Sequence, residues 1–194
     1  MDTLLQIIKD GFISMIPRES GDWLPLIVSL FSTACIVSTS YIRDVKKILV
    51  LLATANLAIA ISYVLQESYN GAIACGLGAI TAIVSGIYDI KKKDIPLWVS
   101  ILYGVAFTIA NLFAWDKWST TGIVIIASLM FAISTIQKTG TMYRVWTMGN
   151  IFLWITYDII TQSGASLVSH MCSFTFMTSG MIIDIVRAKS QKSK

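Results

Sequence analysis

Seven apolar stretches dominate the chain, and each is about as long as a helix that crosses a bilayer. A hydrocarbon core of about 30 Å needs about 20 residues at the α-helical rise of about 1.5 Å per residue. Lipid cannot hydrogen-bond the backbone of an isolated strand, so we expect every stretch to be helical. The links between them are short and polar, and none has room for a second domain. The stretches are residues 23–40, 47–66, 71–90, 96–115, 120–137, 143–160 and 165–186.

The composition points to a membrane protein. Charged residues make up 13% of the 194 residues and hydrophobic residues 55%, with a mean hydropathy of +0.71. A soluble domain carries about 25% charged residues. The 11 acidic residues, one histidine and three cysteines form no motif for acid–base, metal or nucleophile chemistry. We therefore expect no enzyme activity, no metal and no cofactor.

Positive charge predicts the orientation of the helices. If the seven stretches are spans, twelve of the 15 Lys and Arg residues fall on one side of the membrane. Such an excess marks the cytoplasmic side. We expect a multi-pass protein of the bacterial inner (cytoplasmic) membrane, with its N-terminus outside and its C-terminus in the cytoplasm. Its partners would be the lipid bilayer and a small-molecule solute, not nucleic acid. The twelve are Arg43, Lys46, Lys47, Lys91, Lys92, Lys93, Lys138, Arg144, Arg187, Lys189, Lys192 and Lys194; the other three are Lys9, Arg18 and Lys117.

The first 22 residues do not look like a span. Leu4, Ile8 and Phe12 recur at helical spacing among polar residues, and Pro17 ends the pattern. We expect residues 1–22 to form an amphipathic segment that lies in the outer interface. A helix that covers the entrance of the bundle is the alternative. Residues 188–194 would form a basic cytoplasmic tail.

The chain contains an internal repeat. A shift of 94 residues places Asn56 on Asn150, Tyr63 on Tyr157 and Ser85-Gly86 on Ser179-Gly180. The repeats would be residues 23–90 and 120–187, each with three spans. Because three is odd, the span at 96–115 is needed to return the second repeat to the orientation of the first. The predicted fold is therefore an all-α integral membrane protein with seven transmembrane helices. In this fold an inversion-linker helix joins two parallel three-helix repeats (3+1+3), as in some transporters.

This organisation resembles the SWEET/PQ-loop and PnuC-type transporter superfamily. Within it, the chain most resembles the YgjV-like bacterial inner membrane proteins, over nearly all residues after Pro25. The resemblance implies a small-molecule carrier fold and supplies no substrate. The residues that carry it are Tyr41-Ile42-Arg43, Tyr63, Asn70-Gly71-Ala72, Arg144-Val145-Trp146, Trp154 and the last span.

The predicted function is a transporter or facilitator for a small polar solute, of vitamin, nucleoside or sugar type. It would work by alternating access at a midplane site between the two repeats. No buried acidic pair is evident in the sequence, which favours facilitated diffusion. The spans lack the internal prolines on which SWEET-type proteins hinge. This absence favours the alternative, a non-transporting membrane protein of the same fold that acts as a partner-binding or regulatory subunit. A monomer or a homodimer is compatible with the sequence.

The candidate substrate-binding residues lie deep in the spans. The repeat places Asn56 and Asn150 on opposite sides of one axis, where their amides suit a neutral polar ligand. Asn150, Trp154 and Tyr157 share one helical face, so an amide would lie between two aromatic rings. Tyr63 is the counterpart of Tyr157 in the first repeat. Hydrogen bonding between helices and packing in the bundle core are the simpler roles for these residues.

His170 is the remaining candidate. It is the only histidine and lies inside the last span, where a ligand or proton-coupling role is possible. A hydrogen-bonded core histidine is the simpler interpretation. Asp158 lies near the outer end of its span, and we expect it to be an interfacial carboxylate.

Overall fold

The computed structural model of the chain describes residues 2–39, 41–42, 45–113, 118–137 and 140–192. Within these residues the fold is all-helical, with eight α-helices, one short 3-10 helix and no strand. Seven of the α-helices coincide with the seven apolar stretches to within a few residues, except that the last one continues to Lys192. The elements are α1 (Asp2–Ile13), η1 (Ser20–Asp22), α2 (Trp23–Thr39), α3 (Val45–Leu65), α4 (Tyr69–Ile90), α5 (Leu97–Phe113), α6 (Trp118–Thr135), α7 (Gly140–Thr161) and α8 (Gly164–Lys192).

Four helical segments of the described chain are long and apolar enough to cross a membrane. They are Ser20–Thr39, Lys46–Leu65, Tyr69–Ile90 and Gly164–Ile183. Two shorter helical segments, Leu97–Phe113 and Thr120–Thr135, are also apolar. With 22 residues α7 has the length of a span, but it is more polar because it carries Arg144, Asn150 and Asp158.

The surface and the interior have the distribution expected of a protein in lipid. Large apolar side chains such as Ile61, Ile80, Ile101 and Phe152 are more than half exposed. An exposed apolar surface of this extent marks contact with a membrane or a partner. Many buried positions between the helices are instead small and hydroxylated, which lets apolar helices approach closely. Ser29, Ser32, Ser62, Ser85, Ser128, Ser166, Ser169 and Ser173 are among them.

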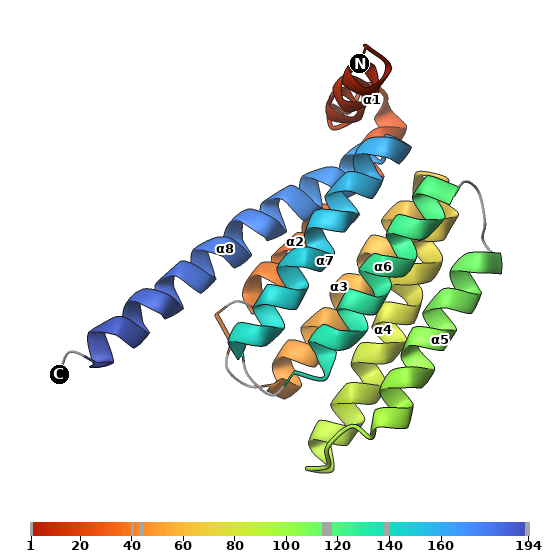
Figure 1. Ribbon diagram of the computed structural model, residues 1–194. Helices are drawn as coiled ribbons and strands as arrows, with labels where there is room; N and C mark the ends of the chain where they lie inside the picture. The colour runs from red at the N-terminus through yellow and green to blue at the C-terminus, as the bar shows by residue number, and fades with distance from the viewer. Residues whose placement is uncertain (1, 40, 43–44, 114–117, 138–139, 193–194) are drawn as a thin grey trace.

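The helices form two similar groups of three. In the first group α3 packs between α2 and α4, and in the second α7 packs between α6 and α8. The groups meet where α2 contacts α8 and where α4 contacts α6, which closes the six helices into a ring. Helix α5 lies outside the ring against α4 and α6 (Figure 1). We call the first group unit 1 and the second unit 2.

The same turn joins the last two helices of each unit. Glu67 follows α3 with a φ of 57°, and Gln162 follows α7 with a φ of 55°. The amide of Ser68 donates to the Tyr63 carbonyl, and the amide of Ser163 donates to the Asp158 carbonyl. This bond across five residues, beside a left-handed residue, is a common way to end a helix. The two units therefore share a local structure as well as a packing order.

Helix α1 lies at the end of the ring where α3 and α7 end and where the two matching turns are (Figure 1). We call this the α1 end. It packs on α7 and more lightly on α8. Gly11 permits the contact, since a Cβ added there would lie 2.8 Å from the carbonyl oxygen of Ile159.

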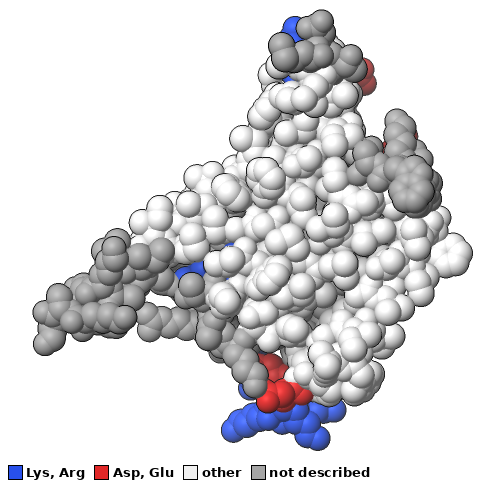
Figure 2. All heavy atoms as spheres, viewed as in Figure 1, with Lys and Arg blue, Asp and Glu red and all other residues white. Residues whose placement is uncertain are grey.

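Charged side chains gather at the two ends and leave an uncharged belt between them (Figure 2). Lys91, Lys92 and Lys93 follow α4 at the end opposite α1, close to Asp89 and Asp94. Lys46, Lys47 and Arg144 lie in the first turns of α3 and α7, at the same end. Arg43, Lys117, Lys138 and Lys194 lie outside the described residues, as do the side chains of Arg187, Lys189 and Lys192.

Alanine substitutions at two glycines of α4 can test the packing inside unit 1. A Cβ added at Gly71 would lie 2.9 Å from the Tyr63 ring, whereas one added at Gly76 meets nothing within 4 Å. Overpacking of this kind costs about 1–3 kcal/mol. We therefore expect Gly71→Ala to lower the thermal unfolding midpoint of the detergent-solubilised protein, and Gly76→Ala to leave it unchanged or raise it. An unchanged midpoint in Gly71→Ala would contradict the described contact.

Candidate functional site

A small cavity lies between the two units and is the centre of the candidate site. Its volume is about 60 Å³, and both units and α5 contribute to its wall. Four of the six predicted site residues line it: Asn56 from α3, Asn150 and Trp154 from α7, and His170 from α8. The other two, Tyr63 and Tyr157, are almost fully buried on its α1 side. The structure thus brings all six together.

The two asparagines line the cavity from facing units and are each tied to a helix. The Asn56 amide nitrogen donates to the Leu52 carbonyl at 2.8 Å, within α3. The Asn150 amide nitrogen donates to the Ala127 carbonyl of α6 at 2.7 Å. Because a carbonyl can only accept, each side chain must present its nitrogen there. The Oδ1 atoms have no hydrogen-bond partner among the described residues. Asn150 therefore joins two helices and still has an acceptor to offer a ligand.

Four rings pack together between the cavity and the α1 end, and we call them the aromatic cluster: Tyr63, Trp154, Tyr157 and His170. Trp154 stacks on His170 with an interplanar angle of 13° and a centroid distance of 5.8 Å. Trp154 and Tyr157 meet edge to face at 5.4 Å, and so do Tyr63 and Tyr157 at 5.9 Å. Such pairs are worth about 0.5–1.5 kcal/mol beyond the area they bury. The aromatic face predicted for α7 does face inward.

Asp158 lies inside the aromatic cluster and was not among the predicted site residues. The expectation of an interfacial carboxylate is wrong, because the side chain is fully buried. Tyr63 Oη donates to Oδ1 at 2.6 Å, and His170 Nδ1 lies 2.7 Å from Oδ2. Oδ1 therefore accepts, and the hydrogen between Oδ2 and Nδ1 is shared by two groups that can each carry it. One hydrogen bond thus joins Asp158 to unit 1 and another joins it to α8.

The contact with Asp158 leaves one ring nitrogen of His170 free. We assign its hydrogen to Nδ1, which then donates to Oδ2 of an Asp158 carboxylate. Nε2 has no hydrogen-bond partner among the described residues, and it is the ring nitrogen left for the cavity that His170 lines. The neutral ring therefore offers an acceptor to the cavity, and the protonated ring a donor.

Hydrogen bonds between the units close the bundle at the α1 end. Gln66, which directly follows α3, donates to Ser166 Oγ and accepts from the Ala165 amide of α8. Ser68 and Ser163, in the two matching turns, lie 2.7 Å apart at their hydroxyl oxygens. The Gly71 amide, in the first turn of α4, donates to Tyr157 Oη. An amide in that turn has no partner within its helix, so the tyrosine of the other unit satisfies it. We call these contacts, together with the Tyr63–Asp158 bond, the closure.

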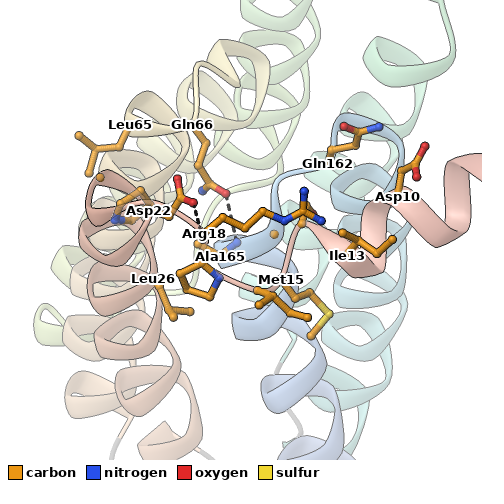
Figure 3. A pocket seen from close by; sticks show the side chains of 16 residues that line it. Asp10, Ile13, Met15, Arg18, Asp22, Leu26, Leu65, Gln66, Gln162 and Ala165 are labelled. Atoms are coloured by element: carbon orange, nitrogen blue, oxygen red, sulfur yellow. Dashed lines mark hydrogen bonds between the residues drawn. The ribbon is translucent and has the colours of Figure 1, made fainter.

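A wide polar cavity lies on the outer side of the closure. It has a volume of about 720 Å³, and the chain that leads from α1 through η1 to α2 forms one wall. Figure 3 shows Arg18 extending across it, with Asp10, Asp22 and Gln162 around its mouth. Gln66 lines this cavity and also belongs to the closure. The closure therefore separates the α1-end cavity from the central one.

A third cavity, of about 410 Å³, opens at the opposite end. Asp89, Lys93 and Gln137 are among its polar lining residues. Leu52 lines both this cavity and the central one, and it packs with Leu49, Ala82 and Tyr143. At this end an apolar cluster around Leu52 lies between the central cavity and the third cavity.

The chemistry of the site is that of binding by hydrogen bonds and aromatic rings. No three His, Cys, Asp or Glu side chains of the described residues are grouped so that they could hold a metal ion. Cys75 lines the cavity as a buried free thiol. The Asp158–His170 pair has a tyrosine at its other carboxylate oxygen.

The Tyr63–Asp158 bond can be tested by removing one oxygen. Tyr63→Phe leaves Oδ1 of a buried carboxylate without its donor, which costs about 1–3 kcal/mol or more. We expect a lower thermal unfolding midpoint for Tyr63→Phe than for the wild-type protein. Tyr69→Phe removes the same atom from an exposed tyrosine of α4 and serves as the control. Equal midpoints for the two variants would contradict the described network.

Comparison with known proteins identifies the family. The chain matches the family model of Imp-YgjV, described as a bacterial inner membrane protein, over residues 23–192. The match covers α2 to α8 and begins after α1. Comparison with curated protein sequences gives no match, and comparison with solved structures gives none either. The chain therefore belongs to the Imp-YgjV family of bacterial inner membrane proteins.

Proposed function

We propose that this protein is a carrier for a small polar solute and that it works by alternating access at the central cavity. The observation that carries the proposal is the position of this cavity. It lies between two units of like architecture, with a wider cavity towards each end of the bundle. Transporters built from parallel repeats bind their solute near the midplane, where the repeats meet.

In this proposal α2–α4 and α6–α8 are the two repeats of a seven-span bundle and α5 is the inversion linker. The packing order, the matching turns and the outlying place of α5 support it. The arrangement is the one implied by the resemblance to the SWEET/PQ-loop superfamily. The excess of Lys and Arg at the end opposite α1 supports an N-terminus outside and a C-terminus in the cytoplasm. Helix α1 then lies over the outer entrance.

The conformation described is then closed to the outside. Gln66, Ser68, Tyr63 and their partners join the units at the α1 end, while the opposite end has a cavity that reaches Leu52. A rocking motion that breaks the closure would connect the central cavity to the α1-end cavity. Because glycine takes up backbone change easily, Gly78 and Gly149 beside the asparagines are candidate hinges in place of proline.

The volume of the central cavity bears on the size of the solute. Pockets for drug-sized ligands measure about 300–1,000 Å³. The central cavity has about 60 Å³ in this closed state, well below that range. The smallest polar solutes fit best, and a nucleoside or sugar would require a wider cavity than the one described.

A ligand screen tests the proposal. We expect one class of solute to raise the unfolding midpoint of the purified protein in a panel of amides, polyols, amines, carboxylates, sugars and nucleosides. A ligand at about 100 times its dissociation constant stabilises by about 2.7 kcal/mol. Asn150→Ala and Trp154→Ala should lose the shift. Asn111→Ala should keep it, because Asn111 is buried in α5 and does not line the cavity.

A response that survives in both cavity variants would place the solute elsewhere and contradict the proposal. A flat response across the panel, with the cavity variants merely less stable, would favour the non-transporting subunit of the same fold. Asn56, Asn150 and Trp154 would then be packing residues.

A further inference from the structure

We propose that the solute is a small organic cation and that it exchanges with a proton held by His170 and Asp158. This inference rests on the proposed function and names the substrate class of the same cavity. It starts from the charge of the site. Asp158 is fully buried, Tyr63 donates to its Oδ1, and His170 Nδ1 lies 2.7 Å from its Oδ2. With the hydrogen of that contact assigned to Nδ1, Asp158 is a carboxylate and carries a negative charge beside the cavity.

In the described part of the chain, no basic side chain on the cavity wall neutralises that charge. No Lys or Arg is among the residues that line the central cavity. Tyrosine and cysteine carry no positive charge in any protonation state, and an isolated buried charge is costly. Either His170 takes up a proton or a cation enters the cavity. The titratable groups shown beside the pair are Tyr63 on α3, Cys75 on α4 and Tyr157 on α7. Helix α6 has no titratable residue, and α1 places Asp10 in the α1-end cavity.

The polar atoms of the cavity that have no hydrogen-bond partner can accept a hydrogen bond, so they suit a ligand that donates. The amide nitrogens of Asn56 and Asn150 are engaged with carbonyls, which leaves their Oδ1 atoms as acceptors. His170 adds Nε2, and the buried hydroxyl of Ser128 has no partner. An ammonium or guanidinium group donates hydrogen bonds and accepts none. It is therefore the complement of this set of atoms.

Size and aromatic content favour the same ligand. Trp154, Phe107 and Phe131 line the cavity, and aromatic faces attract cations. The volume of about 60 Å³ admits a cation of only a few heavy atoms. Ammonium, methylammonium and guanidinium are in this range.

The exchange balances in charge and atoms. When the proton is bound, an N–H bond at Nε2 makes the ring an imidazolium that offsets the Asp158 carboxylate. When the cation enters, this N–H bond breaks and the proton passes to water, so the net charge of the cavity is unchanged. A closed bundle with neither ion buries the carboxylate alone, which disfavours the return of an empty carrier.

Guanidinium and urea make a matched pair of probes, since they share a planar shape and differ in charge. We expect millimolar guanidinium, ammonium or methylammonium chloride to raise the unfolding midpoint of the purified wild-type protein. Urea, and sodium chloride at equal ionic strength, should not. Because one proton competes with one cation, the apparent affinity should rise by up to about tenfold per pH unit and then level off. Asp158→Asn should abolish the shift, and Glu67→Gln, an exposed carboxyl beside the closure, should keep it.

A second measurement needs no variant. His170 is the only histidine, so a spectrum of protein with ¹⁵N-labelled histidine reports this ring alone. We expect a bound cation to shift the ring towards the neutral, Nδ1-protonated form at fixed pH. Stabilisation by neutral solutes such as urea, with none by any of the three cations, would overturn this inference and leave the carrier in place. No stabilisation by any solute of either panel would overturn both. A cation that stabilises the protein without changing the His170 ring would overturn the exchange.

Discussion

The structure depends on how one buried carboxylate is satisfied. Asp158 is fully buried, and each of its oxygens has a hydrogen-bond partner, Tyr63 at Oδ1 and His170 at Oδ2. Because these partners come from α3 and α8, the bond to Tyr63 exists only while the two units are closed at this end. The cost of leaving such a charge unpaired couples the packing of the units to the state of the site.

The other hydrogen bonds of the closure also satisfy polar groups inside the protein, but the groups they join are neutral. The Gln66 amide bonds two residues at the start of α8, and the matching turns place Ser68 beside Ser163. The Gly71 amide, which has no partner within its helix, donates to Tyr157. Small residues between the helices make room for these bonds. At the opposite end an apolar cluster around Leu52 separates the central cavity from the third one.

Much of this architecture could be predicted from the sequence. The apolar stretches are long and separated by short polar links, so seven helices could be placed to within a few residues. Helical periodicity predicted which face of α7 points into the bundle. The predicted repeat placed Asn56 and Asn150 at equivalent depths, and in the structure both line one cavity.

Asp158 could not be assigned in this way. Its depth along α7 is that of an interfacial residue, and its counterpart in the first repeat is Val64. The available signal was spatial: Asp158 and His170 flank one short turn, so a carboxylate and the only histidine lie at similar depths in adjacent helices. The sequence also could not show that α1 and the chain after it form one wall of a wide polar cavity.

The central claim is that the Asp158 network holds the two units together at the α1 end and that they separate when it is broken. Glu67 and Gln162 suit a distance measurement, because each is an exposed residue in one of the matching turns. Spin labels at these positions, in a background without the three cysteines, should give one short distance in the wild-type protein. With Asp158→Asn, a second and longer distance should appear. A single unchanged distance in the folded variant would contradict the account.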